Sequence, residues 1–246
     1  MTLRERLVPV AAELLSARAG VSVRAEEVVF EDGFVHSAAA GPTRLSFVDV
    51  CKAAYGKRVS LFATGYYATP GITWNWEKQE GHPFYYFACG AAVSEVEVDG
   101  YTGMHRVLRT DIVHDVGESL NPGVDRGQIE GGFVQGVGWL TREELAWDKE
   151  GRLLTHSAST YQIPAISDAP LEMHITMLPK AAQQGTIHGS KAVGEPPLML
   201  AFSVREAIRD AVASFGKPGG EVALPAPSTA EAIFTAIQAR RNGKAR

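Results

Sequence analysis

The chain has 246 residues, of which 45% are hydrophobic, and this length provides for one domain or two small ones with a sizeable core. Its 28 acidic and 24 basic residues give a net charge of −4, with no long run of either sign. We therefore expect neither a nucleic-acid surface nor a membrane contact, and the expected partners are small molecules and other proteins.

The chain has two cysteines, Cys51 and Cys89, and neither has a cysteine or histidine neighbour at ligand spacing. A zinc site or an iron–sulfur cluster carried by this chain alone is therefore not expected, and both thiols are expected to be buried. The histidines are scattered in the same way and predict no metal site. A secretory leader and an apolar run of about 18 residues are both missing from the sequence, so the expected compartment is the cytoplasm.

The first element is an amphipathic helix, because apolar residues recur at the helical period from Leu3 to Leu15. It begins almost at Met1, which leaves no room for an N-cap. We expect from this that the chain is a fragment or one part of a split protein, with an ordinary N-terminal helix as the alternative. Val28–His36 then predicts a hairpin around Glu31-Asp32-Gly33, and Ser46–Ala54 predicts a short helix capped by its serine.

The middle of the chain is rich in Val, Tyr and Phe, which favours strands. Three strands are expected here, at Val59–Ala68, Phe84–Val98 and Met104–Val113. A loop opened by Thr69-Pro70-Gly71 separates the first two, and the turn Asp99–Gly103 separates the last two.

The remaining elements combine helices with two further strands. The expected elements are a helix from the Asn121 cap to about Leu145, strands at Leu153–Ser157 and Leu171–Leu178, a helix over Leu198–Ala213, a linker over Gly216–Pro227, and a terminal helix with a capping box at Ser228–Glu231. Because strands cluster instead of alternating with helices, the fold class is α+β, with mixed strand clusters and packed helices. Residues 1–215 are expected to form the main region, either whole or as two lobes with a boundary between 55 and 85, and 216–246 a linker and helix.

The expected helix after Asn121 is dense in glycine between Gly131 and Gly138, yet it fits neither a dinucleotide fingerprint nor a P-loop. Each glycine inside a helix costs about 1 kcal/mol relative to alanine, so something must approach this backbone closely. A neighbouring helix and a bulky bound cofactor both satisfy that requirement. Gln128, near the N-terminal end, is either a ligand contact or an ordinary surface glutamine.

Glu195 stands between a flexible Gly194 and a rigid Pro196-Pro197 that fixes the start of an apolar helix. Its carboxylate is expected near the positive end of that helix, which favours the ionised form and suits it to accept a proton. The alternative is a glutamate that only stabilises the first helical turn.

Several stretches together resemble the molybdopterin-binding subunit of the xanthine dehydrogenase and aldehyde oxidase family, in order and spacing. The matching stretches are Gly90–Asp99, Arg109–Gly117, Leu120-Asn121-Pro122, Gly127–Gly136, Ser159–Pro164 and Ser190–Leu198. The resemblance covers nearly the whole chain and implies the α+β fold of the C-terminal molybdenum-cofactor-binding region.

By this resemblance, Glu195 corresponds to the family's catalytic base, which takes a proton from a hydroxide on molybdenum. Gln128 corresponds to the glutamine that hydrogen-bonds the pterin cofactor, and Val193 and Gly194 would lie against the same cofactor. The glycine-dense helix would then pack around the cofactor cavity.

The stretch Gly194–Leu198 resembles the purine-oxidising branch, and Gly131-Gly132 with Gly138–Thr141 resembles bacterial members. The implied activity is that of a xanthine dehydrogenase, with aldehyde oxidase as the alternative within the family. The family's subunit is much longer, so the implied partners are the rest of that subunit and an iron–sulfur/FAD subunit, which pass electrons to NAD. A split or truncated chain that serves only as an assembly module is a second hypothesis, and an unrelated hydrolase using Glu195 is a third.

Overall fold

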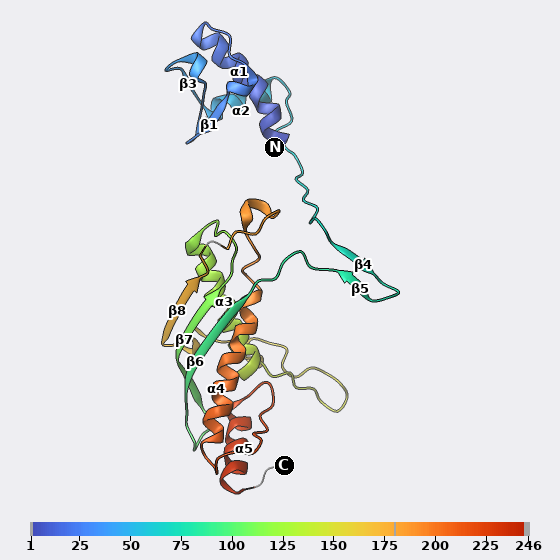
Figure 1. Cartoon of the computed structure of the whole chain (residues 1–246), viewed down its shortest axis with the longest axis vertical. Coiled ribbons are helices and arrows are strands. Elements are labelled where there is room, and N and C mark those ends of the chain that lie inside the picture. Colours follow the sequence, from blue (N-terminus) through green and yellow to red (C-terminus); the bar gives the residue numbers. More distant parts are fainter. Residues whose placement is uncertain (1, 180, 244–246) are drawn as a thin grey trace. The chain divides into compact units, whose positions relative to one another are not determined.

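The computed structural model describes residues 2–179 and 181–243, so the expectation attached to Met1 lies outside the described residues. The chain divides into two compact units, Met1–Ala68 and Thr69–Arg246. Figure 1 shows the helices and strands of each unit. Each unit has its own cluster of buried hydrophobic residues. Helices and small sheets are mixed in both, which confirms the α+β class.

The first unit packs two helices on a small antiparallel sheet. Its elements are α1 (Thr2–Ala19), β1 (Val29–Glu31), β2 (Phe34–His36), β3 (Arg44–Ser46) and α2 (Phe47–Gly56). The predicted helix, hairpin and capped short helix are confirmed, and the Ser46 hydroxyl accepts a hydrogen bond from the Asp49 N–H at 3.0 Å. The third strand was not predicted, because three residues are too few to show an alternating pattern.

The strand predicted at Val59–Ala68 is wrong. These residues form no regular element, and the side chains of Phe62 and Tyr66 are 77% and 93% exposed. The Ser60 and Phe62 carbonyls accept hydrogen bonds from the Arg6 guanidinium, at 3.3 and 2.8 Å, instead of pairing with a strand. Residue types that favour strands form none here, because a strand needs a partner for its backbone groups.

The second unit is built on a three-stranded sheet in the order β6-β7-β8. Its strands are β6 (Gly90–Val98), β7 (His105–His114) and β8 (Glu172–Met177), with β7 antiparallel to β6 and parallel to β8. A bulge at Leu108 shifts the register, so that Val107 and Thr110 both face inward although they are three residues apart. The expected strands at Met104–Val113 and Leu171–Leu178 are thereby confirmed.

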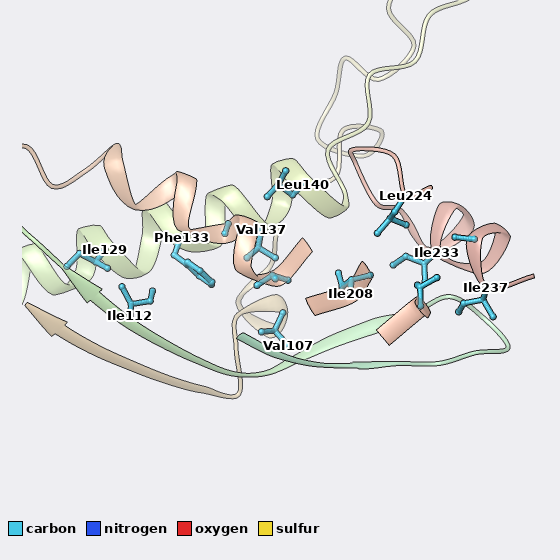
Figure 2. Packing of buried hydrophobic residues seen from close by; sticks show 14 of the residues in the cluster. Val107, Ile112, Ile129, Phe133, Val137, Leu140, Ile208, Leu224, Ile233 and Ile237 are labelled. Carbon is cyan, nitrogen blue, oxygen red and sulfur yellow. The ribbon is translucent and has the colours of Figure 1, made fainter. Parts of the chain in front are cut away.

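Helices cover one face of this sheet. They are α3 (Pro122–Thr141), α4 (Phe202–Ala213) and α5 (Ala230–Arg241). Figure 2 shows Phe133 and Val137 projecting from α3 toward the sheet, where Ile112 and Val107 meet them. Strand positions alternate between this core and solvent, since Ala92 is partly buried while Val93 is 73% exposed.

Two predicted bounds and one predicted strand in this unit need correction. The strand expected from Phe84 begins only at Gly90, because the Tyr85 hydroxyl donates to the Gln184 carbonyl at 2.8 Å and draws this part of the chain to a loop instead of a strand. Leu153–Ser157 is not a strand and contributes only an isolated bridge between Leu153 and Trp147. Helix α3 ends at Thr141 instead of Leu145. At this end of the helix, the Gly138 carbonyl accepts hydrogen bonds from the N–H groups of both Arg142 and Glu143. A short hairpin of β4 (Thr73–Asn75) and β5 (Glu80–His82) was not predicted.

Helices at the C-terminal end differ from the prediction in detail. The helix after Pro196-Pro197 starts as a 3₁₀ turn, η5 (Pro196–Ala201), and continues as α4. Thr229, not Ser228, caps α5, because the Ser228 hydroxyl donates instead to the Pro225 carbonyl at 2.8 Å. The linker over Gly216–Pro227 forms no regular helix or strand, as expected.

Residues 216–243 share the core of the second unit, since Leu224, Ile233 and Ile237 are buried within it (Figure 2).

The prediction of two buried thiols is wrong. Cys89 is exposed and Cys51 is partly exposed, because both sit at the edge of their units' cores. Among the described residues, the structure holds no helix long and apolar enough to cross a membrane.

The core of the second unit can be tested at Phe133, whose side chain is fully buried. Phe133→Ala should lower the free energy of unfolding by about 3–5 kcal/mol, because it removes buried contacts and leaves a cavity. All four tryptophans of the chain lie after residue 69, so tryptophan fluorescence during denaturation reports on this unit alone. Val93→Ala, at an exposed position on the opposite face of the sheet, is the matched control and should change stability by less than about 0.5 kcal/mol. Equal effects of the two variants would contradict the assigned core.

Candidate functional site

The glycines of α3 have two different surroundings. A Cβ atom built on Gly132 would lie 2.8 Å from the Gly194 carbonyl oxygen, and one on Gly136 would lie 2.3 Å from the Leu198 carbonyl oxygen. The backbone that runs from Gly194 into η5 therefore packs directly on α3, with no room for a side chain. Close packing of a neighbouring helix accounts for these two glycines.

Gly127 and Gly131 lie on an open part of the same helix. A Cβ atom on either residue would meet nothing within 4 Å among the described residues, and both glycines are exposed. Packing within the described chain does not explain them. They leave a bare stretch of helix backbone beside Gln128, where a bound group could approach closely.

Gln128 and Gly194 are brought together by this packing. A Cβ atom on Gly194 would lie 3.0 Å from Gln128 Oε1, so the glutamine amide lies against the backbone at Gly194. Gln128 itself is exposed, near the start of a helix that Asn121 caps by accepting a hydrogen bond from the Val124 N–H at 3.2 Å. Its amide can both donate and accept hydrogen bonds at this surface.

Glu195 directly precedes η5, and its side chain is exposed. The carboxylate makes no capping hydrogen bond to η5, whereas the Glu195 carbonyl accepts from the Leu198 N–H at 3.1 Å. The backbone of Glu195 is thus held while its carboxylate has no hydrogen-bond partner among the residues the structure describes. Glu195 stands at the start of η5, as the alternative of a glutamate that stabilises the first helical turn also expects, but it makes no side-chain capping hydrogen bond there.

Val193, the last of the four predicted site residues, is placed differently from the others. Its side chain is partly buried and packs against the core of the second unit. The part of its side chain that packs against this core is not available to a group bound near Gln128 and Gly194.

A buried ion pair lies behind this segment and was not predicted from the sequence. Lys191 Nζ is 2.5 Å from Asp115 Oδ2, and each side chain is only 10% exposed. Burial alone would raise the pKa of the Asp115 carboxyl, but hydrogen bonds from Lys191 and from the Gly117 N–H outweigh it and hold this pKa below its ordinary value. The pair keeps the end of β7 joined to the segment that carries Glu195.

His114, next to Asp115, is a second buried polar residue that sequence reasoning did not single out for a role. Its side chain is 1% exposed, and neither ring nitrogen has a hydrogen-bond partner among the described residues. Burial lowers the pKa of His114, and the opposing effect of the Asp115 carboxylate does not offset it. His114 lies two residues after the buried Ile112 on the inward face of β7, but both faces of this part of the strand mix polar and apolar residues, so the sequence pattern does not place His114 in the core.

The candidate site consists of the exposed residues Gly127, Gln128 and Gly131 of α3 with Gly194, which lies against Gln128, and Glu195, which follows it. It combines bare backbone, one amide side chain and one unpaired carboxylate. Within residues 2–179 and 181–243, no three metal-ligating side chains gather in one place. A metal held through an organic ligand is compatible with such a surface.

The two kinds of glycine in α3 give a matched pair of substitutions. Gly131→Ala should raise the free energy of unfolding by up to about 1 kcal/mol, because it adds helix propensity in open space. Gly136→Ala should lower the free energy of unfolding, because its methyl group would overlap the Leu198 carbonyl. Denaturation followed by tryptophan fluorescence measures both, and a stabilising Gly136→Ala would contradict the close packing.

The buried histidine gives a prediction on pH. Because the pKa of His114 is lowered in the folded state, the unfolded chain binds a proton more readily, and stability should fall as the pH decreases below about 6.5. His114→Leu should reduce this loss between pH 8 and pH 5, measured as the change in the free energy of unfolding. A smaller dependence should remain, since burial also lowers the pKa of His105. An identical pH dependence in the variant and the unsubstituted chain would refute the assignment.

Comparisons with known proteins identify the family of this chain. The family model described as molybdopterin cofactor-binding domain matches residues 1–170, a range that includes Gln128 and ends before Glu195. The xanthine dehydrogenase/oxidase of Gallus gallus is 48% identical over 194 residues, which make up 78% of this chain and 14% of that protein. Aldehyde oxidase 1 of Bos taurus is 46% identical over 194 residues, with coverages of 77% and 14%. The chain thus spans about a seventh of the length of these relatives.

Solved structures share the fold. Quinoline 2-oxidoreductase from Pseudomonas putida 86 is 31% identical with a TM-score of 0.63, over 97% of this chain and 28% of that chain. A Cu,Mo-CO dehydrogenase has a TM-score of 0.64 over the whole of this chain and 28% of its own, but at 19% identity it supports the fold alone. The resemblance inferred from the sequence motifs is confirmed: the chain belongs to the molybdopterin cofactor-binding domain family, together with regions of xanthine dehydrogenases and aldehyde oxidases.

Proposed function

We propose that this chain is part of a molybdenum hydroxylase, a xanthine dehydrogenase that oxidises hypoxanthine and xanthine to urate, with Glu195 as its general base. The observation that carries the proposal is the exposed Glu195 carboxylate, which has no hydrogen-bond partner among the described residues and follows a glycine in contact with Gln128. The family match supports molybdopterin as the cofactor.

In this proposal, Glu195 accepts a proton from the reacting group. The Glu195 carboxylate makes no capping hydrogen bond to η5. Both of its oxygens can therefore accept hydrogen bonds from a group outside the helix. The rigid Pro196 that follows, and the packing of η5 on α3, hold its backbone in one place. A base fixed in this way needs little reorganisation when the proton moves.

Gln128 and the nearby glycines would hold the pterin. The Gln128 amide offers a donor and an acceptor, while Gly127 and Gly131 leave space for close approach of a planar ring. Gly194 adds a backbone edge, and the backbone of Val193 continues it. When bound, the molybdenum–pterin cofactor supplies the oxidising centre that this chain's own side chains lack.

The complete site would need further chains or domains. The chain covers 14% of its curated relatives, so we propose that the rest of the molybdopterin subunit supplies the remaining cofactor contacts and the substrate-orienting residues. An iron–sulfur and FAD subunit would receive the electrons and pass them to NAD.

Glu195→Gln should abolish turnover in the complete complex while leaving the cofactor bound, because it removes the proton acceptor but keeps the size of the side chain. General-base catalysis typically contributes about 10²- to 10⁴-fold, so kcat should fall by at least that range. Glu97→Gln, at an exposed position of β6, is the control and should leave kcat unchanged. Full turnover by Glu195→Gln would refute the assigned role.

Molybdenum and pterin content separates this enzyme role from a pure assembly module. The chain should retain cofactor when produced together with the rest of its subunit, and cofactor-free preparations both with and without that partner would contradict the enzyme proposal.

Aldehyde oxidase activity is the second candidate, because aldehyde oxidases are nearly as similar to the chain as xanthine dehydrogenases are. The two differ in substrate class, and the ratio of kcat/KM for xanthine to that for an aromatic aldehyde in the assembled complex decides between them.

A further inference from the structure

The segment that leads to Glu195 has little regular structure of its own. Residues 191–195 lie between two short 3₁₀ turns, η4 (Ile187–Gly189) and η5, and form neither helix nor strand. Packing of η5 on α3 fixes the far end of this segment, at Glu195, whereas its near end lies at residue 191. The position of the Glu195 carboxylate therefore depends also on what holds the near end.

Lys191 is the residue that holds the near end. Its Nζ donates to Asp115 Oδ2 at 2.5 Å and to the Phe87 carbonyl at 3.1 Å, and its backbone N–H donates to the Val116 carbonyl at 2.9 Å. The ammonium also lies 5.8 Å from the centre of the Tyr86 ring. The side chain of Lys191 is thus bound to Asp115, just after β7, and to the loop before β6, while its backbone is bound to Val116.

The neighbouring residues reinforce this attachment. The Tyr86 hydroxyl accepts a hydrogen bond from the Ala192 N–H at 2.9 Å, and the Gly189 carbonyl accepts one from the Glu118 N–H at 2.9 Å. Gly117 has a φ of +67° and approaches Gly189 so closely that a Cβ atom would lie 2.5 Å from its carbonyl oxygen. These contacts join residues 115–118 to residues 189–192, two segments about 70 residues apart in the sequence, and we call them the junction.

Burial makes the Lys191–Asp115 pair different from other ion pairs of this unit. The exposed pair Arg109–Asp111 has side chains that are 49% and 45% exposed, against 10% for each member of the buried pair. An exposed pair contributes little, whereas removal of one member of a buried pair leaves a charge without a partner. The buried pair thus favours one arrangement of the segment over others.

We infer that Lys191 is a positioning residue for Glu195: its buried ion pair with Asp115 holds the preceding segment so that Gly194 stays against Gln128 and Glu195 keeps its place beside it. The inference rests on the proposed function of Glu195 as base. Lys191 acts through the chain and not on the reacting atoms, because its ammonium is occupied by Asp115 and Phe87. Loss of the junction would leave Glu195 held only from η5, and displacements of about 1 Å at a reacting group can cost about 10²-fold in rate.

The first test needs no activity and uses hydrogen–deuterium exchange of the full chain. Lys191→Met should speed exchange in peptides that cover 190–196, while exchange in α3 and β7 stays as in the unsubstituted chain. Lys191→Arg keeps the positive charge and should restore most of the protection. Arg109→Met breaks the exposed pair and is the matched control, which should leave exchange at 190–196 unchanged.

The second test measures kinetics in the complete complex. Lys191→Met should lower kcat by about 10²-fold with molybdenum content unchanged and KM little affected, because it misplaces the base without removing it. If the unpaired Asp115 prevents folding, the double variant Lys191→Met/Asp115→Asn removes both charges together and should show the same faster exchange and lower kcat.

The outcomes separate the two proposals. Unchanged exchange at 190–196 or unchanged kcat in Lys191→Met, in a complex that Glu195→Gln inactivates, would overturn the inference about Lys191 alone. Full turnover in Glu195→Gln would overturn the proposed base, whatever the exchange experiment showed. Rescue of both exchange and kcat by Lys191→Arg supports the positioning role.

Discussion

The second unit depends on the approach of α3 to the backbone of residues 194–201, where Gly132 and Gly136 leave no space for a side chain. Backbone contact at this distance fixes both helices relative to each other more tightly than interdigitating side chains would. Phe133, between the two glycines, turns instead into the core shared with the sheet (Figure 2). One stretch of helix therefore supports the hydrophobic core on one side and contacts the Gly194 segment of the candidate site on the other.

Much of this arrangement could be predicted from the sequence, because its signals are local. The Asn121 cap and the following Pro122 predicted the start of α3, and the density of glycine predicted a close approach to that helix. The sequence could not predict what approaches α3, because a packed helix and a bound cofactor would both explain the glycines. The structure divides the glycines between these explanations: Gly132 and Gly136 meet a neighbour within the chain, whereas Gly127 and Gly131 remain open.

Several failures of prediction arise where contacts between distant parts of the sequence, or the edge of a core, decide the local structure. Val59–Ala68 has the residue types of a strand, yet the Arg6 guanidinium binds its carbonyls. Cys89 was expected to be buried as an apolar residue, but it stands where the chain enters β6. The junction of Lys191 with Asp115 joins residues 76 positions apart, and nothing in either local sequence indicates the other. Only the resemblance to a family placed Glu195 and Gln128 in one site.

The order of strands in the sheet also has a consequence for how the chain acquires its structure. Strand β7 pairs in parallel with β8, and this register joins Arg109 to Glu172 across a connection that contains all of α3. Closing so long a connection lowers the conformational entropy of the chain before stabilising contacts form. Non-local pairing of this kind therefore slows folding. The hairpin of β6 and β7 can form while the chain is still being synthesised, but residues 190–195 find their attachment at Asp115 only after the later strand exists. Because the core also contains Ile208, Ile233 and Ile237, which follow Glu195 in the chain, the hydrophobic core and the candidate site both require the C-terminal residues before they are complete.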